Sequence, residues 1–400
     1  MMADSGTPIR ILLFADLHLG LERYGSRRTS EALPTRTQDT LHALEELIAN
    51  ARAEPPDLIL FAGDAFKSPQ PEPTLLQAFA EKVLALAELA PLVLLVGRQD
   101  AAPTAERASS LAIFATLSVP QVLVAETHAV HRIETKRGPL TLATAPHCSP
   151  REGLAEALPT LAQEAEAGKG PRLLLGHLTV EEAQRGDEDV LANAALPLDQ
   201  LALPPWDGVA LGGIHRQQAL TSASGPLVLY PGSLARLDFS EAEVEKGFLR
   251  LEIRRGRVDW TFVPVAARPF IRIRADLREA SDPLEALQIA LAETDLAGTI
   301  VRAELRLTRA QDETLAERSV RQLLRAAGAE HVAASRRELS GPLKTRLNVA
   351  DAEPPALLER YLELRGKERG QAFTAEERTA LLTAAQEIWA ELAEEGLAAG

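Results

Sequence analysis

Hydrophobic and polar positions follow two alternating patterns over about the first 265 residues. Short apolar runs that end in a polar turn predict buried strands, as in IRILLFADLH (9–18), DLILFAGDAF (57–66) and PLVLLVG (91–97). Apolar residues at helical spacing predict helices over 40–52 and 74–89. Strands that alternate with helices of this length are typical of a layered α/β domain.

Four later apolar runs predict strands with fewer helices between them: RLLLGHL (172–178), GVALGGIH (208–215), PLVLYPGS (226–233) and GFLRLEI (247–253). Strands joined without a crossover helix are antiparallel, so part of the sheet is expected to be antiparallel. The pattern therefore predicts a mixed domain of the α/β (α+β sandwich) class over residues 8–265.

A smaller unit is predicted over residues 266–340, after a break at PVAARPF (264–270). Residues 270–277 alternate as in a half-buried strand, and Asp282-Pro283 is a helix start signal. A second alternating run, a second helix and a short apolar run follow, which together predict a compact βαβαβ unit.

The last segment, residues 352–400, is predicted to be helical. Thr374 and Glu377 form a capping box. Apolar residues then share one helical face, namely Leu381, Leu382, Ala385, Ile388, Trp389 and Leu392. Such helices either pack on their own domain or dock on a partner, and the pattern alone does not separate these two interpretations.

Composition narrows the class of protein. No apolar run is long enough to cross a membrane, and the N-terminal residues lack a secretory signal pattern, so we expect no membrane contact. The single cysteine, Cys148, excludes an intrachain disulfide and favours a reducing cytoplasm. The net charge of −14 disfavours nucleic-acid binding through the overall field, although a local basic groove remains compatible with it.

Acidic and histidine residues recur where the predicted strands end. Asp16 and His18 lie two residues apart after the first strand, so their side chains point to the same side, and Asp64 follows a glycine after the second. His177 and His215 end two later strands. A lone strand-end histidine is more often a satisfied polar residue than a ligand. Together, however, two Asp and three His give an oxygen and imidazole set that suits manganese, iron or zinc.

The order of these motifs resembles the calcineurin-like metallophosphoesterases, whose pattern runs D-x-H, G-D, G-N-H-D/E, G-H and G-H-x-H. Within that superfamily the chain is similar to the SbcD-type DNA repair exonucleases. Over about residues 8–270 the likeness is carried, in order, by ADLHLGLERYG, LILFAGDAFKSPQPEPT, LLLGHLTVE and YPGSLARLDFSE. It implies a core of two packed mixed sheets flanked by helices, a small α/β cap and a C-terminal helical tail.

The resemblance also implies a function. SbcD-type proteins are manganese-dependent exonucleases that act on DNA, form homodimers and dock their tail on an SbcC-type ATPase. Manganese is therefore the expected metal, with zinc or iron as alternatives. By the same likeness, Asp16, His18 and His215 would hold the first ion, Asp64 would bridge, and His177 would hold the second ion.

Three family positions are altered. GRQD (97–100) stands where the family has GNHD, so Arg98 replaces a ligand asparagine and Gln99 replaces the catalytic histidine. Gly213 replaces the first histidine of G-H-x-H. This count leaves Asp64 and His177 for the second ion, so one ion per chain is expected.

Arg98 allows two interpretations. An arginine cannot bind a cation, but its guanidinium could fill the space at Gly213 and pair with Asp64. Alternatively, it points to solvent in a site that is no longer under selection. Gln99 cannot titrate, so acid–base catalysis at that position is expected to be lost.

Basic residues follow the first motif. Arg23, Arg27 and Arg28, with Arg36 close behind, form either a phosphate-binding patch for DNA or an ordinary solvated loop. Three functional hypotheses result. The chain is an SbcD-like exonuclease subunit with impaired hydrolysis, a pseudo-nuclease scaffold for DNA and the ATPase, or a one-metal phosphoesterase for another substrate.

Overall fold

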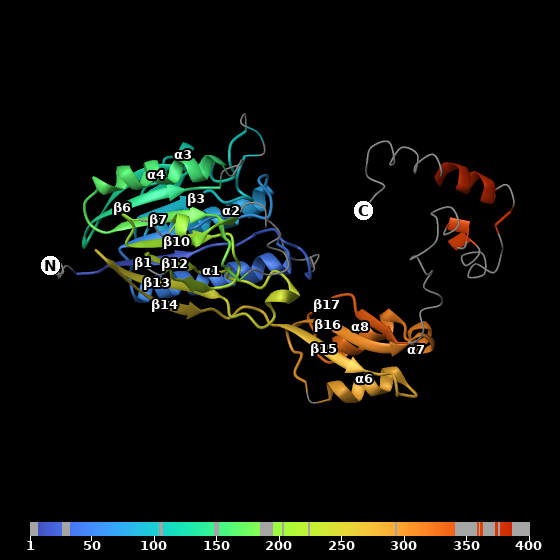
Figure 1. The fold of residues 1–400 in the computed structure, drawn as a ribbon. Helices are drawn as coiled ribbons and strands as arrows, with labels where there is room; N and C mark the ends of the chain where they lie inside the picture. Colours follow the sequence, from blue (N-terminus) through green and yellow to red (C-terminus); the bar gives the residue numbers. More distant parts are fainter. Residues whose placement is uncertain are drawn as a thin grey trace. The chain divides into compact units, whose positions relative to one another are not determined.

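The computed structural model describes nine longer stretches of the chain and a few residues of the tail (Figure 1). The stretches are 7–25, 33–102, 107–147, 152–184, 195–201, 204–222, 225–292, 294–340 and, in the tail, 377–385; residues 104, 358–359, 361–362 and 373–374 are also described. The chain divides into two compact units, Met1–Glu338 and Leu339–Gly400.

The first sheet has six strands in the order β14-β13-β1-β2-β3-β4. The four strands β1 to β4 are parallel to one another, and the hairpin β13-β14 adds to β1 in the antiparallel sense. The bounds are β1 Ile9–Phe14, β2 Leu58–Phe61, β3 Leu92–Leu95, β4 Val122–Ala125, β13 Gly247–Arg254 and β14 Arg257–Pro264. Helices α1 (Thr35–Ala53), α2 (Pro73–Ala87) and α3 (Ala112–Thr116) connect the parallel strands.

The second sheet has six strands in the order β11-β12-β10-β7-β6-β5. Its four central strands run parallel, and β5 and β11 pair antiparallel at the two edges. The bounds are β5 Ala129–Thr135, β6 Gly138–Ala145, β7 Arg172–His177, β10 Gly208–Gly212, β11 Gln218–Leu220 and β12 Leu227–Tyr230. Helix α4 (Glu152–Glu166) lies between β6 and β7 along the chain, and α5 (Leu198–Leu201) and the strand pair β8 (Thr179–Val180) and β9 (Ala195–Leu196) precede β10.

The two sheets pack face to face. Alternate residues of each strand point inward, so Leu13 and Leu60 of the first sheet share one buried cluster with Leu142 and Leu173 of the second. The opposite face of the first sheet packs on α1 and α2, and that of the second packs on α4 (Figure 1). The predicted fold of two packed mixed sheets flanked by helices is confirmed.

A third sheet lies further along the chain, with β16 (Ile300–Thr308) at its centre and β15 (Phe270–Asp276) at one edge. Strands β17 (His331–Val332) and β18 (Arg336–Ser340) both pair with β16. Helices α6 (Pro283–Leu291) and α8 (Glu317–Ala326) pack on its apolar face around a separate cluster, and α7 (Arg309–Thr314) follows β16. The division of the chain at residue 265 stays a prediction.

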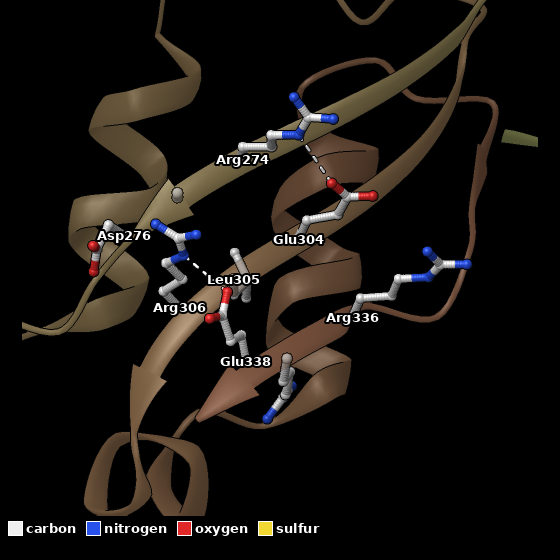
Figure 2. Close-up of a pocket in the computed structure, with 9 residues that line it drawn as sticks. Arg274, Asp276, Glu304, Leu305, Arg306, Arg336 and Glu338 are labelled. Atoms are coloured by element: carbon white, nitrogen blue, oxygen red, sulfur yellow. Dashed lines mark hydrogen bonds and ion pairs between the residues drawn. The ribbon is translucent and has the colours of Figure 1, made fainter. Parts of the chain in front are cut away.

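The opposite face of this third sheet is charged. Arg274 pairs with Glu304 at 3.0 Å and Arg306 pairs with Glu338 at 2.8 Å, as Figure 2 shows. These residues line a hollow of about 580 Å³ together with Arg336. Because most of its charges neutralise one another within the sheet, this hollow resembles a solvated sheet face more than a site of chemistry.

Two helical patterns in the sequence have different outcomes in the structure. The predicted helix over 40–52 is part of α1, and its apolar stripe of Leu41, Leu44, Leu47 and Ile48 is buried in the core of its own chain. In the tail, the capping box is confirmed, because the Thr374 N–H donates to Glu377 at 2.8 Å and the Glu377 N–H donates to Thr374 at 3.2 Å. Ile388, Trp389 and Leu392 lie outside the described residues. None of the described helices is long and apolar enough to cross a membrane.

Candidate metal centre

The five predicted ligands lie at the carboxyl ends of strands from both sheets. Asp16 and His18 follow β1, Asp64 follows β2, His177 ends β7, and His215 follows β10. Parallel neighbours end at the same edge, and backbone hydrogen bonds join the turns: the Asp16 N–H donates to the Gly63 carbonyl at 3.0 Å and the His18 N–H to that of Asp64 at 3.1 Å. The edges of the two sheets therefore build one centre.

A first group of ligand atoms comes from Asp16, His18 and His215, which all lie within 4.8 Å of one another. The Nε2 atoms of His18 and His215 are 3.1 Å apart. His215 Nδ1 lies 3.0 Å from an Oε of Glu241, so Nδ1 carries the proton and Nε2 keeps its lone pair for a metal. The other Glu241 oxygen lies 2.6 Å from the buried Lys246 ammonium.

A second group consists of Asp16, Asp64 and His177. His177 Nδ1 donates to the Ala62 carbonyl at 2.7 Å, which leaves Nε2 free to bind an ion. One Asp64 oxygen lies 3.5 Å from His177 Nε2 and the other lies 3.8 Å from His18 Nε2. Asp64 thus faces both groups, as a bridging carboxylate must. Asp16 is a third possible ligand of the second ion, for which the sequence had predicted only Asp64 and His177.

A further residue, Asp100, had no role in the sequence analysis. Its fully buried carboxylate accepts backbone N–H bonds from Asp64 at 2.7 Å, Ala65 at 3.0 Å and Gly97 at 3.1 Å. It thereby holds the turns after β2 and β3 together. Burial, and then the charge of Asp64, raise the pKa of Asp100 to about 7.

The carboxylates of Asp16 and Asp64 are buried and need a compensating positive charge. Burial raises the pKa of Asp16 to about 6 and lowers the pKa of His18 to about 4. Burial would lower the pKa of His177 as well, but the charges of Asp64 and Asp16 outweigh it and raise the pKa, so without a metal these carboxylates favour a proton on this imidazole. A divalent ion neutralises such a set and binds its lone pairs, so the residues fit a metal.

The Arg98 side chain does not pair with Asp64, as one of the two interpretations of the sequence had predicted. Its side chain is exposed, and among the described residues no ion pair joins it to Asp64. Asp64 instead accepts the backbone N–H of Gln99 at 2.7 Å. With its amide turned to satisfy both ends, the Gln99 side chain donates to the Lys67 carbonyl and accepts from Arg98 at 3.1 Å. The hypothesis that Arg98 fills the space at Gly213 and pairs with Asp64 is therefore wrong, and the exposure of Arg98 agrees with the other interpretation, in which it points to solvent.

Gly213 contacts the metal centre through its backbone and not through a side chain. Its N–H donates to both oxygens of Asp16, at 3.1 and 3.2 Å. A Cβ at this position would lie 3.2 Å from His177 Nε2. The glycine therefore leaves space directly beside the free nitrogen of His177.

His147 is a residue that the sequence analysis missed. Its ring lies edge-on to that of His177, with centroids 6.5 Å apart and planes at 86°. Burial, and then His177, lower the pKa of His147 to about 4. The sequence feature that could have identified His147 is its position just after strand β6. This strand was not predicted, because its sequence mixes polar and apolar residues.

The basic loop is only partly described. Arg23 lies 3.3 Å from Asp238 and stacks on the Tyr24 ring. Arg27 and Arg28 lie outside the described residues. Arg36 is buried and pairs with Asp39 at 2.7 Å, so it does not belong to a phosphate-binding surface.

Comparison with known proteins gives a family match and several similar solved structures. Residues 9–120 match the family model of the calcineurin-like phosphoesterases. Among solved structures, TT1561 of Thermus thermophilus is 18% identical, with 64% of this chain and 99% of that chain covered and a TM-score of 0.41. A dimetal phosphatase from Danio rerio is 9% identical, with 65% and 100% covered and a TM-score of 0.42. GAP50, the anchor in the inner membrane complex of Plasmodium, is 11% identical, with 64% and 85% covered and a TM-score of 0.42.

The family match over residues 9–120 and the metal-ligand groups support metal-dependent hydrolase activity of the metallophosphoesterase type. The family match supports the calcineurin-like superfamily, whose members use divalent metals.

Proposed function

We propose that the chain is an SbcD-type subunit that hydrolyses phosphodiesters at DNA ends, slowly, together with an SbcC-type ATPase. The observation that carries this proposal is the set of strand-end ligands, which combines the motif order of that family with a metal centre. Manganese is the proposed metal. Homodimer formation and a cytoplasmic location are part of the same proposal.

The residues of the centre have distinct tasks in such a reaction. A bound divalent ion would make hydroxide available near neutral pH and neutralise the phosphoryl oxygens. His215 is held in its ligand form by Glu241, and Asp64 is oriented by the Gln99 N–H. Gln99 itself can only donate or accept a hydrogen bond, so the leaving oxygen has no titratable partner at this position. Such a loss typically costs about 10²–10⁴ in rate.

A second candidate, the pseudo-nuclease scaffold, is favoured by the same Gln99 and by the exposed cation at Arg98. The third, a one-metal phosphoesterase for another substrate, differs from both in its preference for a small phosphodiester over DNA.

The test compares manganese-dependent cleavage of linear DNA by the wild-type chain, Gln99→His and Asp64→Asn, each with the ATPase partner. We expect weak wild-type cleavage, a gain of about 10²-fold or more in Gln99→His, and none in Asp64→Asn. Gln99→His is preferred to a change at Gly213, whose φ of 98° disfavours any side chain. Cleavage absent in both the wild type and Gln99→His, with DNA still bound, would establish the scaffold instead. Hydrolysis of bis(p-nitrophenyl) phosphate but not of DNA would favour the third candidate.

A further inference from the structure

We propose that His147 is a ligand of a second divalent ion, which it binds together with Asp64 and His177. It would replace donors that Arg98 and Gly213 cannot supply. This inference rests on the proposed metal-dependent function and deepens it, because it makes the centre a two-ion site by a residue outside the motif pattern.

The fold brings His147 to the second group of ligands. Strand β6 pairs in parallel with β7, with Ala145 opposite Gly176, so the two strands end at the same edge. His147 follows two residues after β6, and His177 is the last residue of β7. The His147 N–H donates to the Val96 carbonyl at 3.0 Å, which ties its backbone to the turn after β3. His147 is therefore fixed between the ends of both sheets.

The ring geometry fits a shared ion. The two imidazoles stand at 86° with centroids 6.5 Å apart. Rings that bind one ion at about 2.1 Å per nitrogen have centroids about 5–6.5 Å apart, so the observed distance is at the upper end of this range. His147 is not among the ligand atoms that lie within 4.8 Å of one another, so its ring has to turn towards Asp64 and His177 to share an ion with them. The ring nitrogens of His147 have no hydrogen-bond partner among the described residues. A half-buried imidazole without a partner, beside another whose Nε2 is free, is the arrangement that a metal would complete.

The His147 ring has space to turn. The side chain of His147 lines a hollow of about 920 Å³ whose wall also includes Arg98 and His128. On the other side of His177, the missing Cβ of Gly213 leaves its Nε2 uncovered. Asp64 and Asp16 supply the negative charge that a divalent ion requires.

Arg98 acts against this ion. It is exposed and lines the same hollow as His147, so its charge repels a cation without occupying the position. The two residues should consequently have opposite effects. Loss of the His147 ring should weaken the second ion, and loss of the Arg98 charge should strengthen it.

The experiment measures manganese bound to the full-length chain by elemental analysis and titration calorimetry. We expect two ions for the wild type and one for His147→Ala, with the second dissociation constant raised about 100-fold or more. His128→Ala is the matched control, since this histidine lines the same hollow but is not in ring contact with His177, and it should keep two ions. Arg98→Ala should bind the second ion more tightly than the wild type.

An independent readout is electron paramagnetic resonance of the manganese-loaded chain. Two ions about 4 Å apart give an exchange-coupled spectrum, which should appear in the wild type and disappear in His147→Ala. His147→Asn, which keeps an oxygen donor, should retain part of it if His147→Ala does not fold. A wild type that binds one ion, or a His147→Ala chain with two ions at unchanged affinity, overturns the inference. Since no DNA is used, failure of DNA cleavage leaves this result unaffected and counts only against the proposed nuclease.

Discussion

Glu241 connects a metal ligand to a buried cation. One of its oxygens holds His215 Nδ1 at 3.0 Å, and the other accepts from the Leu237 N–H at 3.0 Å and from Lys246 at 2.6 Å. Burial alone would raise the pKa of Glu241, but Lys246 and His215 outweigh it and lower the pKa to about 2. A carboxylate that orients a histidine ligand is thus itself held in the charged form.

Replacing this carboxylate should destabilise the protein in a pH-dependent way. Glu241→Gln leaves the Lys246 charge buried and unpaired, so we expect the unfolding free energy to fall by about 3–5 kcal/mol at pH 7. Because the folded pKa of Glu241 is lower than its unfolded value, its contribution is present above about pH 4.5 and is lost as the pH falls towards 2. The difference between variant and wild type should therefore shrink over this range, in urea unfolding of the metal-free chain.

The matched control is Glu252→Gln. Glu252 pairs with Arg10 at 3.7 Å with both side chains nearly half exposed, so this change should cost less than about 1 kcal/mol at any pH. If both variants lose the same unfolding free energy, the buried Glu241–Lys246 pair stabilises the protein no more than the exposed Glu252–Arg10 pair.

At the scale of elements, the turns after the strands decide the geometry of the centre. Asp16, His18 and Asp64 all have positive φ, at 55°, 45° and 62°. Side chains seldom adopt this conformation, and it persists here because Asp100 and the cross-turn hydrogen bonds fix the backbone. Gly63 (φ 95°) lets the turns approach so closely that a Cβ there would lie 2.6 Å from His177 Nδ1.

Gly63→Ala should therefore lower the unfolding free energy by more than backbone strain alone would. Gly256, at φ 74° with nothing within 4 Å of an added Cβ, supplies the comparison. We expect Gly256→Ala to lower the unfolding free energy by about 1–2 kcal/mol. Gly63→Ala should lose about 1–3 kcal/mol more through overpacking, together with manganese affinity. Thermal unfolding and titration calorimetry measure both, and an equal cost at the two glycines would mean that close packing at Gly63 is unimportant.

At the scale of the whole molecule, the chain consists of two compact units, and the tail belongs to the second. Part of its predicted apolar stripe is exposed, since Leu381 is 43% accessible. An exposed apolar residue on a capped helix agrees with a docking surface, which the family resemblance assigns to the ATPase.

Deletion of residues 352–400 should separate docking from folding. We expect the melting temperature of the remaining chain to stay within about 2 °C of the wild type, because its sheets have their own clusters. Binding to the ATPase should be lost, as measured by calorimetry. Unfolding of the shortened chain would show that the tail is part of the core instead.

Local patterns in the sequence determined much of this protein. Apolar runs set the buried strands, such as Leu58–Phe61, because a strand covered on both faces needs no polar residue. The ligand types and their strand-end positions were also local, and so was the capping box at Thr374. Strand β5 and strand β6 escaped prediction because polar and apolar residues mix along both, although most of β6 is buried.

The tertiary structure alone decided which side chains meet. Arg98 is exposed, and with its amide turned Gln99 donates to the Lys67 carbonyl, which lies in a different turn. His147 comes to face His177 because β6 and β7 are parallel neighbours, and Asp16 joins both ligand groups because the edges of the two sheets meet at the centre. A sequence pattern records which groups a strand end carries, but distances between strand ends follow from sheet order and packing. That is why the metal-ligand residues could be named from the sequence, while the role of Asp100 and the place of His147 could not.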